Sequence, residues 1–261
     1  MLRRYFKVWW MLAVAWTQIA FSSRFGLIAF SLGKILRFVF FFLFLVILMT
    51  KTKNIAGYTF WQVILFYATF NLLDTAAQFL WREVYRFRRY VNSGSFDYFL
   101  VKPISPLFRA LFGGTDIMDF FVFLISIGFV VYSIMQIGSF SIYSIFIYIL
   151  LVFNGLIIAM AFHILILVVG ILSTEVENVI WLYRDLSTMA RVPIDVYKEP
   201  VRSLLIFAIP LGVMMAFPVK AFLSLLSWQF IAYAFIVSFV MIFVSLWLWK
   251  YALREYSSAS S

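Results

Sequence analysis

The pattern of polar and apolar positions is dominated by one long uncharged passage. From residue 120 to residue 174 the chain runs 55 residues without Asp, Glu, Lys or Arg. As a single helix this passage would be roughly 80 Å long, more than twice the thickness of the hydrocarbon core of a bilayer. It must therefore fold back, and residues 136–139, Gln-Ile-Gly-Ser, form its polar interruption. The pattern predicts two membrane-spanning helices joined by a very short turn.

Six apolar passages are near or above the length of about 20 residues that a helix needs to cross a bilayer. They cover residues 25–49, 58–80, 117–135, 140–172, 178–194 and 228–249. Trp228, Trp247 and Trp249 lie at the ends of the last passage, and aromatic residues are enriched at the membrane–water interfaces. The sequence predicts an all-α polytopic membrane bundle with six spans, built as one transmembrane domain over residues 1–261.

The fifth passage has two interpretations. In one, residues 203–219 cross the membrane and residues 174–202 form a cytoplasmic loop. In the other, residues 178–194 cross, and residues 203–223 enter the outer leaflet and return as a re-entrant segment. Pro210 and Pro218 would break a helix in that region, and broken helices are tolerated at membrane depth where protein shelters them.

Residues 1–24 precede the first span and contain Arg3, Arg4 and Lys7 ahead of an apolar stretch. A cleaved signal peptide is one interpretation, with residues 13–15 as the cleavage site. The apolar core before that site covers only residues 8–12, which is shorter than the usual 7–15 residues. An uncleaved interfacial helix, with Trp9 and Trp10 at headgroup depth, fits better.

The composition is that of a membrane protein. The mean hydropathy is +1.02 and 12% of residues are charged, against about 25% in soluble domains. Cysteine is absent, so neither disulfides nor thiolate metal sites exist in this sequence. The net charge of +10 indicates cationic loops at an anionic membrane surface rather than binding to nucleic acid.

Basic residues are distributed unequally between the two sets of loops. Twelve lie on one side, and three (Lys51, Lys53 and Lys220) lie on the other. The positive-inside rule predicts that both termini are cytoplasmic, and we expect a multi-pass protein of the plasma membrane. The twelve are Arg3, Arg4, Lys7, Arg24, Arg82, Arg86, Arg88, Arg89, Lys102, Arg109, Lys250 and Arg254.

Charged or titratable residues inside the apolar passages need a reason, because an ionised group at the centre of a membrane helix costs about 2.5–3.5 kcal/mol on insertion scales. Opposite charges on separate spans suggest ion pairs in the bundle or a polar translocation cavity. For Lys34 and Arg37, extension toward the headgroups is an equal alternative. The candidates are Lys34, Arg37, Asp74, Asp116, Asp119, His163, Arg184 and Asp185.

Catalytic and metal-binding patterns are sparse. Asp116 and Asp119, with Glu175 and Glu177, could hold a cation, but helix-end solvation is the better interpretation, so no metal site is predicted. His163 reads as a hydrogen-bonded packing residue. No serine–histidine–acid set and no phosphate-binding loop is present, so no catalytic residue and no ATP site is assigned to this chain.

The loop between the second and third spans, residues 82–106, is the most structured polar region. Arg82, Arg86 and Arg89 are spaced to form a basic stripe on a helix that continues out of the membrane. A glycine turn and two prolines, Pro103 and Pro106, follow. A lipid anchor would explain the charges alone, whereas the apolar residues Phe96, Phe99 and Leu100 favour a docked protein partner.

Two stretches resemble type-2 ABC exporter permeases, specifically the six-span subgroup of about 260 residues. The first is Gly94-x-Phe96-Asp97-x-x-Leu100-x-Lys102-Pro103, after the second span. The second is the run at residues 191–197, Arg-Val-Pro-Ile-Asp-Val-Tyr, followed by Ile-Pro at 209–210 and Phe-Pro at 217–218. With the N-terminal helix the resemblance covers essentially the whole chain, and it favours 178–194 as the fifth span.

The resemblance implies the transmembrane half of an ATP-driven exporter. A second permease, identical or related, would complete the substrate path, and an ABC ATPase dimer on separate chains would bind ATP and Mg. Its coupling segment, residues 82–106, would contain the candidates Arg82, Arg86, Arg89, Gly94, Phe96, Asp97, Leu100, Lys102 and Pro103. An intramembrane lipid-modifying enzyme using Asp116, Asp119 or His163 is the alternative. The substrate is not identified by either interpretation.

Overall fold

The computed structural model describes residues 2–22, 24–138, 140–173 and 176–257. Within these ranges the chain consists of helices and connecting turns and forms no strand. Five helices are long and apolar enough to cross a membrane, or six when a sharply bent pair is counted as one. The predicted all-α polytopic bundle is therefore confirmed.

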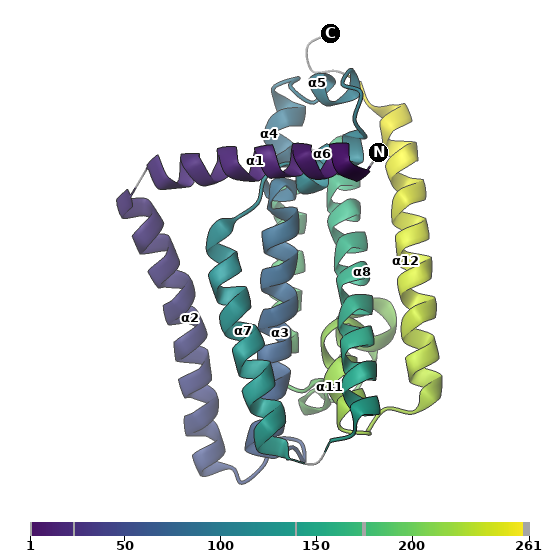
Figure 1. The fold of residues 1–261 in the computed structure, drawn as a ribbon. Coiled ribbons are helices and arrows are strands. Elements are labelled where there is room, and N and C mark those ends of the chain that lie inside the picture. The colour runs from purple at the N-terminus through teal and green to yellow at the C-terminus, as the bar shows by residue number, and fades with distance from the viewer. Residues whose placement is uncertain (1, 23, 139, 174–175, 258–261) are drawn as a thin grey trace.

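The long helices follow the apolar passages closely, because the chain has no other way to satisfy its backbone hydrogen bonds in lipid. They are α1 (Leu2–Ser22), α2 (Arg24–Lys51), α3 (Phe60–Trp81), α7 (Ile117–Ile137), α8 (Ile142–Leu172) and α12 (Trp228–Glu255). Figure 1 shows α1 lying across one end of the bundle, while the other five run along it.

The two ends of the bundle carry different connections (Figure 1). We call one the α1 end, where α1 and the short helices α4 (Phe87–Asn92), α5 (Asp97–Leu100) and α6 (Pro106–Phe112) lie. The C-terminal part of α12 also reaches this end. We call the other the turn end, where α2 connects to α3 and α7 connects to α8.

Helix α3 is the centre of the bundle, whereas α2 and α12 lie at its edges. In the most apolar stretch of each helix, the share of the stretch that is buried inside the protein is 78% for α3, 11% for α2 and 17% for α12. The exposed faces of α2 and α12 are almost entirely apolar and include Phe40, Ile47, Phe239 and Phe243. Such faces are stable against lipid or another membrane helix but not against water.

The region predicted to contain the fifth span divides into two parts. Helix α9 (Val176–Thr188) has 13 residues and continues through a short 3-10 turn at Met189–Arg191, so it ends before the predicted position 194. The following segment, residues 201–222, contains α10 (Val201–Ser203), a π-helical turn (Leu204–Ala208), a second one (Gly212–Ala216) and α11 (Phe217–Phe222).

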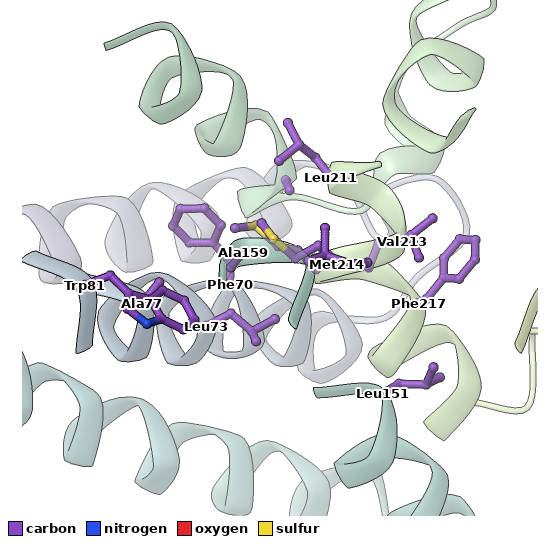
Figure 2. Packing of buried hydrophobic residues seen from close by; sticks show 14 of the residues in the cluster. Phe70, Leu73, Ala77, Trp81, Leu151, Ala159, Leu211, Val213, Met214 and Phe217 are labelled. Carbon is purple, nitrogen blue, oxygen red and sulfur yellow. The ribbon is translucent and has the colours of Figure 1, made fainter. Parts of the chain in front are cut away.

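This segment, which we call the bent segment, changes direction by 84° between Ala208 and Gly212. Pro210 lies at the bend, where its ring and its missing N–H prevent a continuous helix. Figure 2 shows Leu211, Val213, Met214 and Phe217 of the bent segment among side chains of α3 and α8. The bend is thus sheltered inside the bundle, as broken helices at membrane depth require.

Gly155 of α8 permits the closest approach of the bent segment. A methyl group placed on Gly155 would lie 2.5 Å from the carbonyl oxygen of Met214. Met214 is fully buried, so its backbone has no room to retreat. Glycine at this position lets the backbone of the bent segment pack directly on α8.

Candidate functional site

The predicted coupling segment, residues 82–106, folds into a short arm at the α1 end. A 3-10 turn (Arg82–Arg86) follows α3, and then come α4, a tight turn and α5. Gly94 has a φ of 69°, its N–H donates to Val91 O at 3.1 Å, and its carbonyl accepts from Asp97 N at 3.1 Å. The predicted glycine turn is therefore a compact, hydrogen-bonded connection between α4 and α5.

The predicted basic stripe is not formed. The 3-10 turn interrupts the helix, and Arg82 lies apart from Arg86 and Arg89, which line one open hollow together with Arg88. Arg82 turns toward the bundle, where its Nε lies 3.7 Å from Asp116 Oδ2, and Arg89 remains exposed. The expectation of one continuous stripe is wrong because the 3-10 turn breaks the helix and Asp116 attracts Arg82 toward the bundle.

Glu83, which sequence reasoning missed, is the electrostatic centre of the arm. Its carboxylate is fully buried and accepts from Arg86 Nη1 at 3.1 Å, from Arg109 Nη1 at 2.9 Å and from Tyr90 OH at 2.9 Å. A buried carboxylate is stable only with such partners. The sequence signal was a lone acidic residue within a strongly basic run.

Phe96 lies inside the protein rather than on a docking surface. It is fully buried, with its ring centroid 5.0 Å from that of Phe87 and 5.1 Å from that of Tyr256. The adjacent Asp97 Oδ1 accepts from Tyr256 OH at 2.9 Å. Because no partner can reach Phe96, the expectation that it contacts another protein directly is wrong, and Phe96 instead fixes the arm to the end of α12.

The apolar side chains that the arm exposes lie on and just after α5. Tyr98 is 67% exposed, Leu100 40% and Val101 79%. Lys102 and Pro103 are exposed beside them. We call these five residues the distal face. Of the predicted coupling residues, Leu100, Lys102 and Pro103 belong to it, whereas Gly94, Phe96 and Asp97 form the support beneath.

Helix α1 is fastened to the base of the arm. Trp16 Nε1 donates to Gly113 O at 3.0 Å, and the guanidinium carbon of Arg86 lies 3.7 Å from the centre of a Trp16 ring. Near the start of α1, Tyr5 packs edge-on against Phe108 with ring centroids 4.7 Å apart. These contacts join α1 to Arg86 of the arm and to α6 beside it.

Lys34 turns into the bundle instead of extending toward headgroups. Its Nζ donates to Asp119 Oδ1 at 2.6 Å and to Asp116 Oδ2 at 3.1 Å. These groups come from α2 and from the start of α7, and Arg82 joins them through Asp116. Of the two alternatives for Lys34, the structure has the ion pair between helices.

The remaining intramembrane candidates have other surroundings. Asp74 accepts from Gln78 Nε2 at 2.9 Å, and Arg184 lies 5.5 Å from the Trp181 ring and 5.9 Å from that of Tyr85. Asp185 is exposed. Arg37 is also exposed, and it lines a small cavity that Lys34 and Asp119 share.

His163 is a packing residue. It is 1% exposed, and its Nδ1 donates to the carbonyl of Ala159 at 2.8 Å, one turn earlier in α8. The rings of Trp81 and Tyr183 surround it at centroid distances of 5.2 Å and 5.3 Å. Within the described ranges no group of three or more His, Cys, Asp or Glu side chains is placed to hold a metal ion. Glu175 lies outside those ranges.

Asp195, also missed as a site residue, gathers three donors at the turn end. Its Oδ1 accepts from Lys220 Nζ at 2.8 Å and lies 3.0 Å from Arg202 Nη2, and its Oδ2 accepts from Tyr58 OH at 2.8 Å. Although burial alone would raise the pKa of Asp195, these partners, Lys220 foremost, hold it below its usual range. Burial, reinforced by the neighbouring Asp195 carboxylate, raises the pKa of Tyr58.

The comparisons with known proteins agree with this architecture. A family model described as ABC-2 family transporter protein matches residues 35–260, which include every long helix except α1 and the first part of α2. Searches of curated proteins and of solved structures returned no match. Because the family model covers most of the chain, this membrane protein belongs to the ABC-2 family of transporter proteins.

Proposed function

We propose that this chain is one permease subunit of an ATP-driven exporter. A second permease, identical or related, completes the substrate path, and separate ATPase subunits bind ATP and Mg beneath it. The observation that carries the proposal is the braced arm at the α1 end. Its distal face is exposed and partly apolar, while contacts to α1, α6 and α12 brace it from behind.

A rigid arm suits coupling because a docked ATPase can then move membrane helices rather than merely deform a loop. Pushing on the distal face would act on α6 through Glu83 and Arg109, and on α12 through Phe96 and Tyr256. Arg82 extends the connection to α7 through Asp116. The ATPases would bias a bundle with two stable arrangements, which is how such switches work in general.

In this proposal the α1 end is cytoplasmic and the turn end faces outward, at the plasma membrane. Helix α9 and its 3-10 turn carry the chain across, and the bent segment is re-entrant. This arrangement is supported by Asp195, which binds Arg202 and Lys220 near opposite ends of the bent segment and also Tyr58 of the α2–α3 connection. Lys198 and Arg202 then join the outward residues, making twelve basic residues inside against five outside.

The test is purification with and without partners. An affinity-tagged chain should co-purify with a second permease and with an ATPase that has a phosphate-binding loop, identified by mass spectrometry. The complex in lipid vesicles should hydrolyse ATP, and the chain alone should not. Turnover of a lipid or small molecule by the purified chain alone, at a normal enzymatic rate, would overturn the proposal.

A further inference from the structure

A small cavity inside the bundle is lined by basic groups from two separate elements. It lies between α2, α3, α7 and the turn after α9, and Arg37, Arg191, Lys34 and Asp119 contribute to its wall. Its enclosed free volume is about 10 Å³, which is room for about one water molecule. Lys34 is neutralised by Asp116 and Asp119, so the charges to be explained are those of Arg37 and Arg191.

Neither arginine forms an ion pair with a carboxylate in the described part of the chain, although Asp74 acts on Arg191 from a longer distance. Among the residues that the structure describes, no carboxylate oxygen lies within 4.0 Å of either guanidinium group. Arg191 is half-buried and lies 5.3 Å from the ring of Phe70 and 5.4 Å from the ring of Phe41. Aromatic faces stabilise a cation only partly, so its hydrogen-bond donors are left for another group.

Arg37 cannot reach the headgroups easily. It is the fourteenth of the 28 residues of α2, so each end of the helix is about 20 Å away along the axis. Its side chain is nevertheless exposed on the surface of the chain, beside the cavity. An exposed guanidinium in the middle of an apolar helix needs an anion, because lipid tails offer it no hydrogen bonds.

A second cavity adjoins the first and is apolar. It has a free volume of about 130 Å³ between α2 and α7, and Phe42 and Phe129 are among its lining residues. The two cavities share Phe38 and Val122 as a common wall. A basic site beside an apolar slot matches a molecule with an acidic head and a hydrocarbon body.

We propose that Arg37 and Arg191 form a binding site for the acidic head of an amphiphile whose apolar part occupies the slot between α2 and α7. The forked guanidinium groups suit carboxylate, phosphate or sulfate oxygens, which they bind with charge-assisted hydrogen bonds. The inference rests on the proposed function, because an exporter needs a site for its cargo within the membrane. The acidic head belongs to a free amphiphile or to an anionic lipid.

The first test measures binding to the purified chain or its complex in a non-ionic detergent. The probes are dodecanoic acid carrying a BODIPY fluorophore and the uncharged methyl ester of the same compound, followed by fluorescence anisotropy. The acid should bind more tightly than the ester. Arg37→Gln and Arg191→Gln should each weaken binding of the acid about tenfold or more and leave binding of the ester unchanged.

Matched variants separate charge recognition from other effects. Arg37→Lys should retain part of the preference for the acid, and Lys53→Gln, which removes a basic residue from the α2–α3 connection, should change nothing. Thermal unfolding midpoints check that the glutamine variants fold. Equal binding of acid and ester, or wild-type binding of the acid by both glutamine variants, would overturn the proposal.

The source of the anion is decided in nanodiscs of phosphatidylcholine, with or without phosphatidylglycerol. Competition by phosphatidylglycerol against the acid would assign the site to a lipid headgroup, and absence of competition would assign it to a free amphiphile; both outcomes support an anion site. If Arg37→Gln instead separates the two permeases without affecting the probe, the arginines meet a protein partner and the proposal fails. ATPase co-purification, which tests the proposed function, is scored independently.

Discussion

Lys220 and Asp195 form an ion pair of 2.8 Å between Nζ and Oδ1 at the turn end. Lys220 belongs to α11, near the end of the bent segment, and the same oxygen of Asp195 lies 3.0 Å from Arg202 near its start. One carboxylate thereby ties together two positions that are eighteen residues apart. This closes the bent segment into a loop whose base is fixed and whose apex lies among α3 and α8.

The first prediction concerns the strength of this closure. Asp195→Asn preserves the shape of the side chain but leaves Lys220, which is 9% exposed, without its counter-ion. We expect a loss of about 1–3 kcal/mol in the free energy of unfolding, less than for a fully buried pair because the Asp195 side chain is 16% exposed. Thermal unfolding in detergent measures it. Lys198→Gln, at an exposed neighbouring position, is the control, and an equal loss there would show that the Asp195 contacts are not special.

The second prediction is the pH dependence of the same contacts. The pKa of Asp195 is lower in the folded state, so its contribution to stability is present above the unfolded value of about 3.9 and is lost as the pH falls through the folded value. Tyr58 has a raised pKa, so its contribution is present below about pH 10 and is lost at higher pH. The stability difference between wild type and Asp195→Asn should be flat between these limits and shrink below about pH 4.

The alkaline limit can be checked separately. Tyr58→Phe removes the hydroxyl that donates to Asp195, so this variant should lack the loss of stability that Tyr58 causes above about pH 10. Unfolding midpoints measured against pH for both proteins provide the comparison. A difference between wild type and Asp195→Asn that already changes around pH 6 would mean that another group controls this region.

The third prediction concerns the packing of the bent segment on α8. Gly155→Ala places a methyl group against Met214 O, and we expect a cost of about 1–3 kcal/mol together with slower transport. Gly128→Ala is the matched control, because Gly128 is an exposed helical glycine with nothing within 4 Å of the added methyl group. It should be neutral or stabilising by up to about 1 kcal/mol. Equal effects at the two positions would contradict the close approach.

Long apolar passages were sufficient to predict the five long helices that run along the bundle, because backbone hydrogen bonding in lipid leaves the chain little choice. The predicted last span ended too early, at residue 249, since charged residues follow. The helix continues to Glu255, which brings Tyr256 to Phe96 and Asp97. Tyr256 helps to cover Phe96, so a residue that was expected at the surface is buried.

The centres formed by Glu83 and Asp195 could not be predicted in the same way. Asp195 has a partner 137 residues away along the sequence, and Glu83 has one 26 residues away besides its local partner Arg86. No local spacing encodes the distant pairings. A single chain also contains no information on which neighbours accompany it in the membrane. The role of α2, which exposes most of its apolar face, therefore depends on tertiary and quaternary packing rather than on its own pattern.

The fourth prediction is the topology. The sequence has no cysteine, so single cysteines can be introduced and labelled from outside cells with an impermeant maleimide. Positions 53 and 198 should be labelled, and positions 88 and 254 only after the membrane is permeabilised. Position 198 distinguishes the two interpretations of the fifth span, because it would be cytoplasmic if residues 203–219 crossed. External labelling at 88 would reverse the orientation.

The fifth prediction separates support from contact in the arm. Phe96→Ala empties a fully buried site and should cost about 3–5 kcal/mol, lowering the yield of folded protein. Tyr98→Ala and Val101→Ala alter exposed side chains of the distal face, so each should change stability by no more than about 0.5 kcal/mol. If these residues contact an ATPase, each substitution should weaken its association about tenfold.

The measurement pairs thermal unfolding with ATPase co-purification and ATP hydrolysis in vesicles. Arg254→Gln, near the end of α12 but outside the distal face, serves as the surface control. A variant of Tyr98 or Val101 that keeps its stability but loses the ATPase would locate the docking surface on α5 and the residues just after it. Unchanged association and unchanged hydrolysis in the double variant Tyr98→Ala/Val101→Ala would remove the distal face from the coupling mechanism, because its two most exposed apolar side chains would then contribute nothing to the contact.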